Sequence, residues 1–169
     1  MSILGKVLTL CAVLAISACT NATGYDDTNA TNLNGGGTGV AGSASDPTSV
    51  AYFQQTVGDR VLFLVDQSTL SDQGRTILQG QADWLSANTD YTAVIEGHAD
   101  EQGTREHNLA LGARRANAAR EFLISRGVAG NRLKVVSYGK ERPIEICSDE
   151  NCYAKNRRAV TVLAGGLTG

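Results

Sequence analysis

The sequence predicts a two-layer α+β domain in which two helices cover one face of a mixed β-sheet. Segments with strand and helix patterns alternate in the order β-α-β-α-β-β along residues 50–169. The strand segments are short and rich in β-branched residues, whereas the helix segments repeat their apolar residues every three or four positions. A chain of 169 residues has room for one such domain with appendages.

The first half of the domain predicts a strand, a helix and a second strand. Residues 60–65 (RVLFLV) are almost continuously apolar and indicate the first strand. Ser71 is a preferred N-cap residue, so a helix is expected over 72–88. Residues 91–96 (YTAVIE) alternate between two faces and indicate the second strand, which a polar loop over 97–104 follows.

The second half predicts a long helix and two further strands. The helix is expected over 105–126, because Gly127 then stands at the C′ position and Val128 in the place of the Schellman hydrophobic contact. Residues 133–138 and 158–163 predict the third and fourth strands, with a polar segment that holds two cysteines before the last one. Small residues on one helix face allow a close approach to the sheet. That face consists of Leu109, Gly112, Ala116, Ala119 and Leu123.

The start of the chain has the pattern of an export signal. Residues 1–18 carry a single charge, Lys6, and a ten-residue, mostly apolar run over 7–16 that is too short to span a bilayer. The segment that ends in Cys19 resembles the bacterial lipobox, in which cleavage before a cysteine precedes its lipidation. An ordinary secretory signal with an incidental cysteine is the alternative.

Residues 19–49 are predicted to be the lipidated cysteine and a flexible linker. Gly, Ser, Thr and Asn dominate this segment, which cannot bury enough apolar surface to offset the entropy of ordering it. As a flexible coil it would span roughly 30 Å. The segment is therefore interpreted as a tether for the domain over 50–169.

The charge balance argues against a nucleic-acid partner. The chain has 15 Lys and Arg against 17 Asp and Glu, a formal net charge of −2, whereas nucleic-acid-binding domains are usually basic. Charged residues make up 19% and hydrophobic residues 42% of the chain, which excludes a wholly disordered acidic protein.

The most informative stretch is residues 97–116 (GHADEQGTREHNLALGARRA). Asp100 lies in the loop after the second strand, and Arg115 lies on the following helix, on the same face as Asn108 and Leu111. Folding the helix back on the strand brings the carboxylate and the guanidinium toward one cleft. Such a pair is complementary to a zwitterion. An ordinary Asp–Arg salt bridge is the alternative, which spacing alone favours.

Three separated motifs agree in order and spacing with one known family. They are residues 97–116, SYGKERP at 137–143 and NRRAVTV at 156–162. The chain resembles the peptidoglycan-associated lipoproteins, whose globular part is an OmpA-like domain, and the resemblance covers residues 50–169. It implies that Asp100 and Arg115 grip diaminopimelate, the zwitterionic residue of the peptidoglycan stem peptide.

The end of the first strand departs from the family pattern. The family often has Phe-Asp there, whereas this chain has Phe63-Leu64. The resemblance therefore implies a groove wall at Phe63 but not the contact of the missing Asp, and Asp66 is interpreted as a turn residue. Residues 156–158 (NRR) match the family, although a capping Asn and two solvated arginines would give the same pattern.

The resemblance implies a binding protein of the outer membrane without cofactor, metal or catalysis. Its implied partners are peptidoglycan, outer-membrane lipid through Cys19, and TolB with other Tol proteins. Thr20 follows Cys19, and the absence of an Asp there favours the outer membrane. The alternative function is a metal-dependent peptidoglycan hydrolase that uses His98, Asp100 and His107, although no HExxH or comparable motif is present.

Two cysteines close to each other precede the last strand. Cys147 and Cys152 are separated by four residues, and a disulfide is the default for such a pair in an exported protein. A zinc site is the alternative, but no second pair of ligands accompanies the cysteines. We expect a disulfide with a structural role.

Overall fold

The computed structural model describes residues 42–146 and 148–165. The predicted signal peptide, Cys19, most of the predicted linker and Cys147 lie outside these residues. The described part forms a four-stranded sheet in the order β1-β4-β2-β3. Strands β2 and β3 are parallel, while β4 runs antiparallel to both β1 and β2. The predicted mixed sheet is thereby confirmed. The strands are β1 (Arg60–Leu62), β2 (Tyr91–His98), β3 (Leu133–Gly139) and β4 (Arg158–Gly165).

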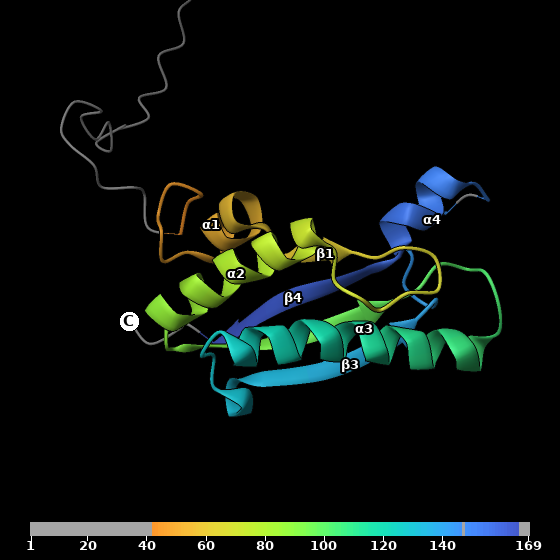
Figure 1. The fold of residues 1–169 in the computed structure, drawn as a ribbon. Helices are drawn as coiled ribbons and strands as arrows, with labels where there is room; N and C mark the ends of the chain where they lie inside the picture. The colour runs from red at the N-terminus through yellow and green to blue at the C-terminus, as the bar shows by residue number, and fades with distance from the viewer. Residues whose placement is uncertain (1–41, 147, 166–169) are drawn as a thin grey trace, which may run out of the picture. The chain divides into compact units, whose positions relative to one another are not determined.

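Two long helices lie together on one face of this sheet, as Figure 1 shows. They are α2 and α3, and their apolar faces pack against alternate residues of the strands, such as Ala93 and Ile95 of β2. The two-layer arrangement predicted from the pattern of segments is confirmed. The helices are α1 (Val50–Tyr52), α2 (Asp72–Ala87), α3 (Arg105–Ser125) and α4 (Glu150–Asn156), with short π and 3-10 turns at η1 (Phe53–Gly58) and η2 (Gly130–Arg132).

The predicted ends of both long helices are confirmed in detail. Ser71 caps α2, because its Oγ accepts a hydrogen bond from Gly74 N at 3.1 Å. Helix α3 ends in a Schellman motif: Val128 N donates to Leu123 O at 3.1 Å, and Gly127 has a φ of 99°.

Three segments differ from the prediction. Strand β1 ends at Leu62 rather than at residue 65, since the chain turns at Asp66, whose φ is 53°. The polar segment predicted before the last strand contains a short helix, α4, which Asp149 caps. Part of the predicted linker also contacts the domain, because Trp84 Nε1 donates to Pro47 O at 2.7 Å.

A pair of glycines sets the distance between α3 and β2. A Cβ atom at Gly112 would lie 2.8 Å from Gly97 O and 2.4 Å from Ser137 Oγ, and a Cβ at Gly97 would lie 1.8 Å from Gly112 O. Real Cβ atoms do not approach backbone oxygens so closely. Only glycine at both positions therefore lets the helix lie directly on the strand, as the small residues on its predicted inner face suggested.

Gly112→Ala is expected to lower the free energy of unfolding by about 1 to 3 kcal/mol, because the added methyl group overlaps the backbone of β2. Helix propensity alone predicts the opposite sign, since Ala forms helices better than Gly. Gly80→Ala on α2 is the matched control, because its Cβ would meet Val57 Cγ1 at an ordinary 3.6 Å. Urea unfolding measures both changes. A Gly112→Ala protein as stable as the parent would contradict the close contact.

Candidate functional site

A pocket of about 200 Å³ lies between the turn after β1, the loop after β2 and the start of α3. Three of the predicted site residues line it: Asp100, Asn108 and Leu111. Asp66, which the sequence indicated only as a turn residue, lies on its wall as well. The complete lining is Val65, Asp66, Asp100, Gln102, Gly103, His107, Asn108 and Leu111.

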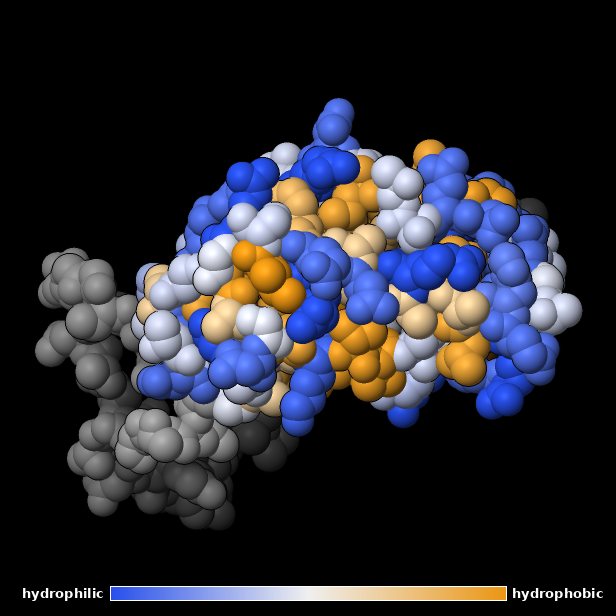
Figure 2. Space-filling view, turned by 60° about the horizontal axis from the view of Figure 1, so that its bottom comes forward, coloured by the Kyte–Doolittle hydropathy of each residue, from blue (hydrophilic) through white to orange (hydrophobic). Residues whose placement is uncertain are grey.

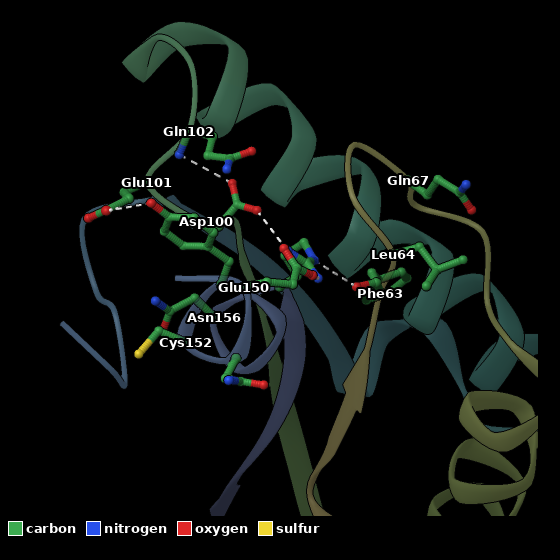
Figure 3. A network of polar contacts seen from close by, with 12 residues as sticks. Phe63, Leu64, Gln67, Asp100, Glu101, Gln102, Glu150, Cys152 and Asn156 are labelled. Carbon is green, nitrogen blue, oxygen red and sulfur yellow. Dashed lines mark hydrogen bonds and ion pairs between the residues drawn. The ribbon is translucent and has the colours of Figure 1, made fainter. Parts of the chain in front are cut away.

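Asp100 supplies a nearly buried carboxylate to this pocket. One oxygen, Oδ1, accepts a hydrogen bond from Gln102 N at 3.3 Å. The other, Oδ2, accepts from Nη1 of Arg157 at 3.1 Å (Figure 3). Each oxygen can accept more than one hydrogen bond, so the carboxylate keeps acceptor capacity toward the pocket.

Asn108 fixes the loop that carries Asp100. Its buried side chain donates from Nδ2 to Gln102 O at 2.8 Å, which ties the loop to the first turn of α3. Thr104 caps that helix by accepting from His107 N at 3.2 Å. The position of Asp100 thus follows from how the loop joins the helix.

Arg115 is fully buried behind the pocket and does not line it. Its guanidinium donates to three backbone carbonyls: Nε to Gln67 O at 2.7 Å, Nη1 to His98 O at 2.9 Å and Nη2 to Leu64 O at 3.0 Å. A guanidinium has five N–H groups, so each Nη retains one hydrogen. The predicted contact of Arg115 with a ligand carboxylate stays a prediction.

Burial lowers the pKa of Arg115 to about 10, and the negative charge of Asp100 partly opposes this shift. The side chain therefore remains charged at neutral pH. Backbone carbonyls satisfy its hydrogen bonds without neutralising that charge, and the electrostatic influence of Asp100 reaches the guanidinium without a direct hydrogen bond between them.

Phe63 lies beside a neighbouring pocket instead of the pocket of Asp100. This second pocket, of about 410 Å³, includes Phe63, Leu64 and Gln67 in its lining. The Phe63 ring is buried, with its centroid 5.3 Å from Cζ of Arg115. Leu64, which replaces the Asp of the family pattern, is 66% exposed. The segment after β1 therefore contributes to two pockets.

The side-chain partner of Asp100 is Arg157, a residue that spacing did not indicate. Its side chain is buried, and Nε donates to Phe63 O at 3.1 Å. Nη2 also bonds to Oε1 of Glu150. Burial disfavours the charged form of Arg157, but the hydrogen bonds to Glu150 and Asp100 outweigh it and raise the pKa. The family motif at 156–158 was the signal that pointed to this residue.

The other two residues of that motif are also buried rather than solvated. Asn156 accepts from Ile144 N at 2.8 Å and donates to Glu145 O at 2.8 Å, so it holds the segment before α4. Arg158 donates to Arg142 O at 3.1 Å. The interpretation of the two arginines as solvated side chains is therefore wrong.

The residues proposed for a metal-dependent hydrolase are not arranged as a metal site. Nε2 of His107 lies 2.8 Å from Oδ1 of Asp66 at the rim of the pocket. His98 is buried at the end of β2, where its ring stacks on Tyr138. Among the described residues, no group of three or more His, Cys, Asp or Glu side chains is placed to hold a metal ion.

The predicted disulfide stays a prediction, because Cys147 lies outside the described residues. Cys152 is buried on α4, in the turn that Asp149 caps through Asn151 N and Cys152 N.

The chain belongs to the OmpA family, whose model matches residues 62–157. It is 49% identical over 159 residues to the peptidoglycan-associated lipoprotein of Mesorhizobium japonicum, a match that covers 94% of this chain and 91% of that protein. The peptidoglycan-associated lipoprotein of Rhizobium meliloti is 51% identical over 129 residues, covering 76% and 73% of the two chains.

Solved structures agree with this assignment. The peptidoglycan-associated lipoprotein of Burkholderia pseudomallei superposes with a TM-score of 0.65 at 36% identity, covering 70% of this chain and 100% of that one. The C-terminal domain of Helicobacter pylori MotB shares the fold alone, with a TM-score of 0.60 at 21% identity over 64% of this chain and 86% of that one. Among the described helices, none is long and apolar enough to cross a membrane.

The buried imidazole of His98 is expected to make the fold sensitive to acid. Neither ring nitrogen has a hydrogen-bond partner, and the nearest carboxylate oxygen, of Glu96, is 3.7 Å from Nε2. Burial lowers the pKa of His98 to about 4, and the positive charges of Arg158 and Arg142 act in the same direction. Protonation therefore favours the unfolded chain, where the pKa is near 6.5.

The stability contributed by neutral His98 is expected to be complete above about pH 6.5 and to be lost as the pH falls toward 4. Between pH 7 and pH 4.5 the loss should be about 2 to 3 kcal/mol. Denaturant unfolding of the parent and of His98→Gln across this range measures it. The difference between the two curves isolates His98, because the carboxylates titrate in both proteins. Parallel curves would contradict the assignment.

Proposed function

We propose that this chain is an outer-membrane lipoprotein that binds peptidoglycan non-covalently and so links the outer membrane to the cell wall. The names of relatives about half identical to it over most of their length support this proposal. The pocket that contains Asp100 supplies the chemistry. Through the family resemblance, we also propose that the protein acts in the Tol-Pal system, with TolB as a partner. In that system it would contribute to envelope maintenance and cell division.

The proposed ligand is the free end of diaminopimelate in the stem peptide, which carries one ammonium and one carboxylate group. The observation that carries the proposal is the nearly buried carboxylate of Asp100 on the wall of a small pocket. The carboxylate of Asp100 is proposed to accept hydrogen bonds from the ammonium group. The hydrogens that Arg115 retains on Nη1 and Nη2 are the proposed donors to the ligand carboxylate. Because Arg115 is buried behind the pocket, this contact requires the side chains between them to move when the ligand binds.

Asn108 and Leu111 complete the proposed contact surface. Both line the pocket of Asp100, and both are buried on the inner face of α3. Phe63 lines the neighbouring pocket, and its ring packs against the guanidinium of Arg115. Its proposed role is therefore to hold Arg115 in place. We assign these residues to holding the ligand, and we assign no catalytic role to any of them.

Binding rather than hydrolysis is the proposed activity. The alternative would need His98, Asp100 and His107 around one metal ion, an arrangement that the described residues do not form. Incubation of the purified chain with sacculi separates the two functions. Release of soluble muropeptides, or stoichiometric zinc in the purified protein, would contradict the binding proposal.

Asp100→Asn is expected to weaken binding to purified sacculi by at least about 30-fold, because a buried charged acceptor of the ammonium group is lost. The fold should persist, since Arg157 keeps Glu150 as a partner. Arg114→Ala is the matched control: Arg114 is an exposed neighbour of Arg115 that does not line the pocket. Cosedimentation of the full chain with sacculi measures both. Equal losses for the two variants would contradict the site.

Arg115 is a poor choice for this test of ligand contact. Its removal would leave the carbonyls of Leu64, Gln67 and His98 without their buried donor, so loss of binding would follow from a displaced wall as readily as from a lost contact. Asp100 separates these effects, because its carboxylate makes one side-chain hydrogen bond, to Arg157, and one to a backbone amide.

Cys19→Ser is expected to abolish lipidation and membrane retention while leaving sacculus binding in vitro unchanged. Each buried CH₂ of an acyl chain contributes about 0.8 kcal/mol, and one chain alone anchors only marginally. The resemblance implies a diacylglyceryl group on the Cys19 thiol and a third acyl chain on its amine, which together should hold the protein firmly. Fractionation of cells after wall digestion, with a fatty-acid probe, measures anchoring. Retention or labelling of the Cys19→Ser protein would contradict the proposed anchor.

A further inference from the structure

One buried guanidinium is shared by two carboxylates of unequal exposure. The Arg157 side chain is 4% exposed, that of Asp100 8% and that of Glu150 65%. Asp100, Glu150 and the carbonyl of Phe63 converge on this guanidinium from three different parts of the chain (Figure 3). The charge of Arg157 is therefore divided between a carboxylate in the pocket and a carboxylate at the surface.

The division favours Glu150. Its two carboxylate oxygens bond to both Nη atoms of Arg157, with Nη1 to Oε2 at 3.4 Å, whereas Asp100 has a single bond from Nη1 at 3.1 Å. The third nitrogen, Nε, is held by Phe63 O at 3.1 Å, so the guanidinium plane is fixed from the opposite side. In this orientation Arg157 donates one hydrogen bond to Asp100, while its other hydrogen bonds go to Glu150 and to the carbonyl of Phe63.

Helix α4 holds Glu150 in this place through contacts of its own. Tyr153 donates from its hydroxyl to Oε1 of Glu101 at 3.1 Å, and Ser148 donates to the same oxygen at 3.2 Å. Glu101 directly follows Asp100 in the chain. The helix that carries Glu150 is therefore attached to the same loop that carries the pocket carboxylate.

We propose that Glu150 is a positioning residue of the ligand site. By accepting hydrogen bonds from Arg157, it offsets part of the positive charge of Arg157 and so leaves the carboxylate of Asp100 available to an ammonium group. This inference rests on the proposed function. The charged groups around the site include the guanidinium groups of Arg115 and Arg157 and the carboxylates of Asp66, Asp100 and Glu150. Loss of Glu150 would make this group more positive by one charge, and Asp100 would be the sole carboxylate partner of Arg157 among the described contacts. Both changes oppose the approach of an ammonium group.

The test measures the affinity of the full chain for two probes by calorimetry. One probe is a diaminopimelate-containing stem peptide, and the other is the same peptide acetylated on the free amine of diaminopimelate. Glu150→Gln is expected to weaken binding of the first by about three- to tenfold, since Glu150 is partly screened by solvent. Binding of the acetylated peptide should not weaken, because it has no ammonium group for Asp100 to accept. The readout is the ratio of the two affinities, because a purely structural role of Glu150 would leave this ratio unchanged.

Glu145→Gln is the matched control. Glu145 lies in the segment before α4 and pairs with Lys155 at 3.0 Å, so its substitution removes one negative charge without touching Arg157. Only its backbone groups bond to Asn156, and these persist in the variant. Glu150→Asp keeps the charge and should preserve most of the affinity ratio even if the longer side chain also helps to fold α4.

The outcomes separate this inference from the proposed function. Equal weakening for both peptides in Glu150→Gln, or the same ratio in Glu150→Gln and Glu145→Gln, would overturn the role of Glu150 and leave Asp100 as the ammonium site. Full affinity for the free peptide in Asp100→Asn would overturn the proposed function, and the role of Glu150 with it. Selective loss for the free peptide in Glu150→Gln alone supports the inference.

Discussion

The buried guanidinium of Arg115 holds together the elements that form the candidate site. It extends from α3 and binds carbonyls of the segment after β1, at Leu64 and Gln67, and the carbonyl of His98 at the end of β2. A buried charge is tolerated only when hydrogen bonds compensate its lost hydration. These carbonyls must therefore stay in place for the side chain to remain buried, and the walls of both pockets depend on them.

The close contact of α3 with β2 makes this arrangement possible. Arg115 follows Gly112 by three residues on α3, and His98 directly follows Gly97 on β2. Because neither glycine has a Cβ, the helix backbone lies against the strand, and the guanidinium reaches the carbonyl of His98 at 2.9 Å. The surface seen in Figure 2 carries hydrophobic patches among hydrophilic ones.

Local signals predicted most of the fold, whereas the connections within the site depend on contacts between distant residues. Ser71 and Gly127 mark helix ends by their own chemistry, and both predictions are confirmed. The pairing of Asp100 with Arg157 joins residues 57 positions apart, which no periodicity indicates. The partners of Arg115 are backbone carbonyls, which every residue has, so the sequence could place the arginine near the cleft but could not show what it binds. Helix α4 was missed because seven mostly polar residues carry little helix signal.

The two buried arginines differ in what their partners do to their charge. Arg157 faces carboxylates, which neutralise it, whereas Arg115 faces carbonyls, which satisfy its hydrogen bonds and leave its charge in place. Asp100 shares Arg157 with Glu150, so Arg157 offsets only part of the negative charge of Asp100. A carboxylate on the pocket wall therefore lies near a buried guanidinium that no carboxylate neutralises through a direct hydrogen bond. A carboxylate beside a guanidinium is the charge pattern that the proposed zwitterionic ligand requires.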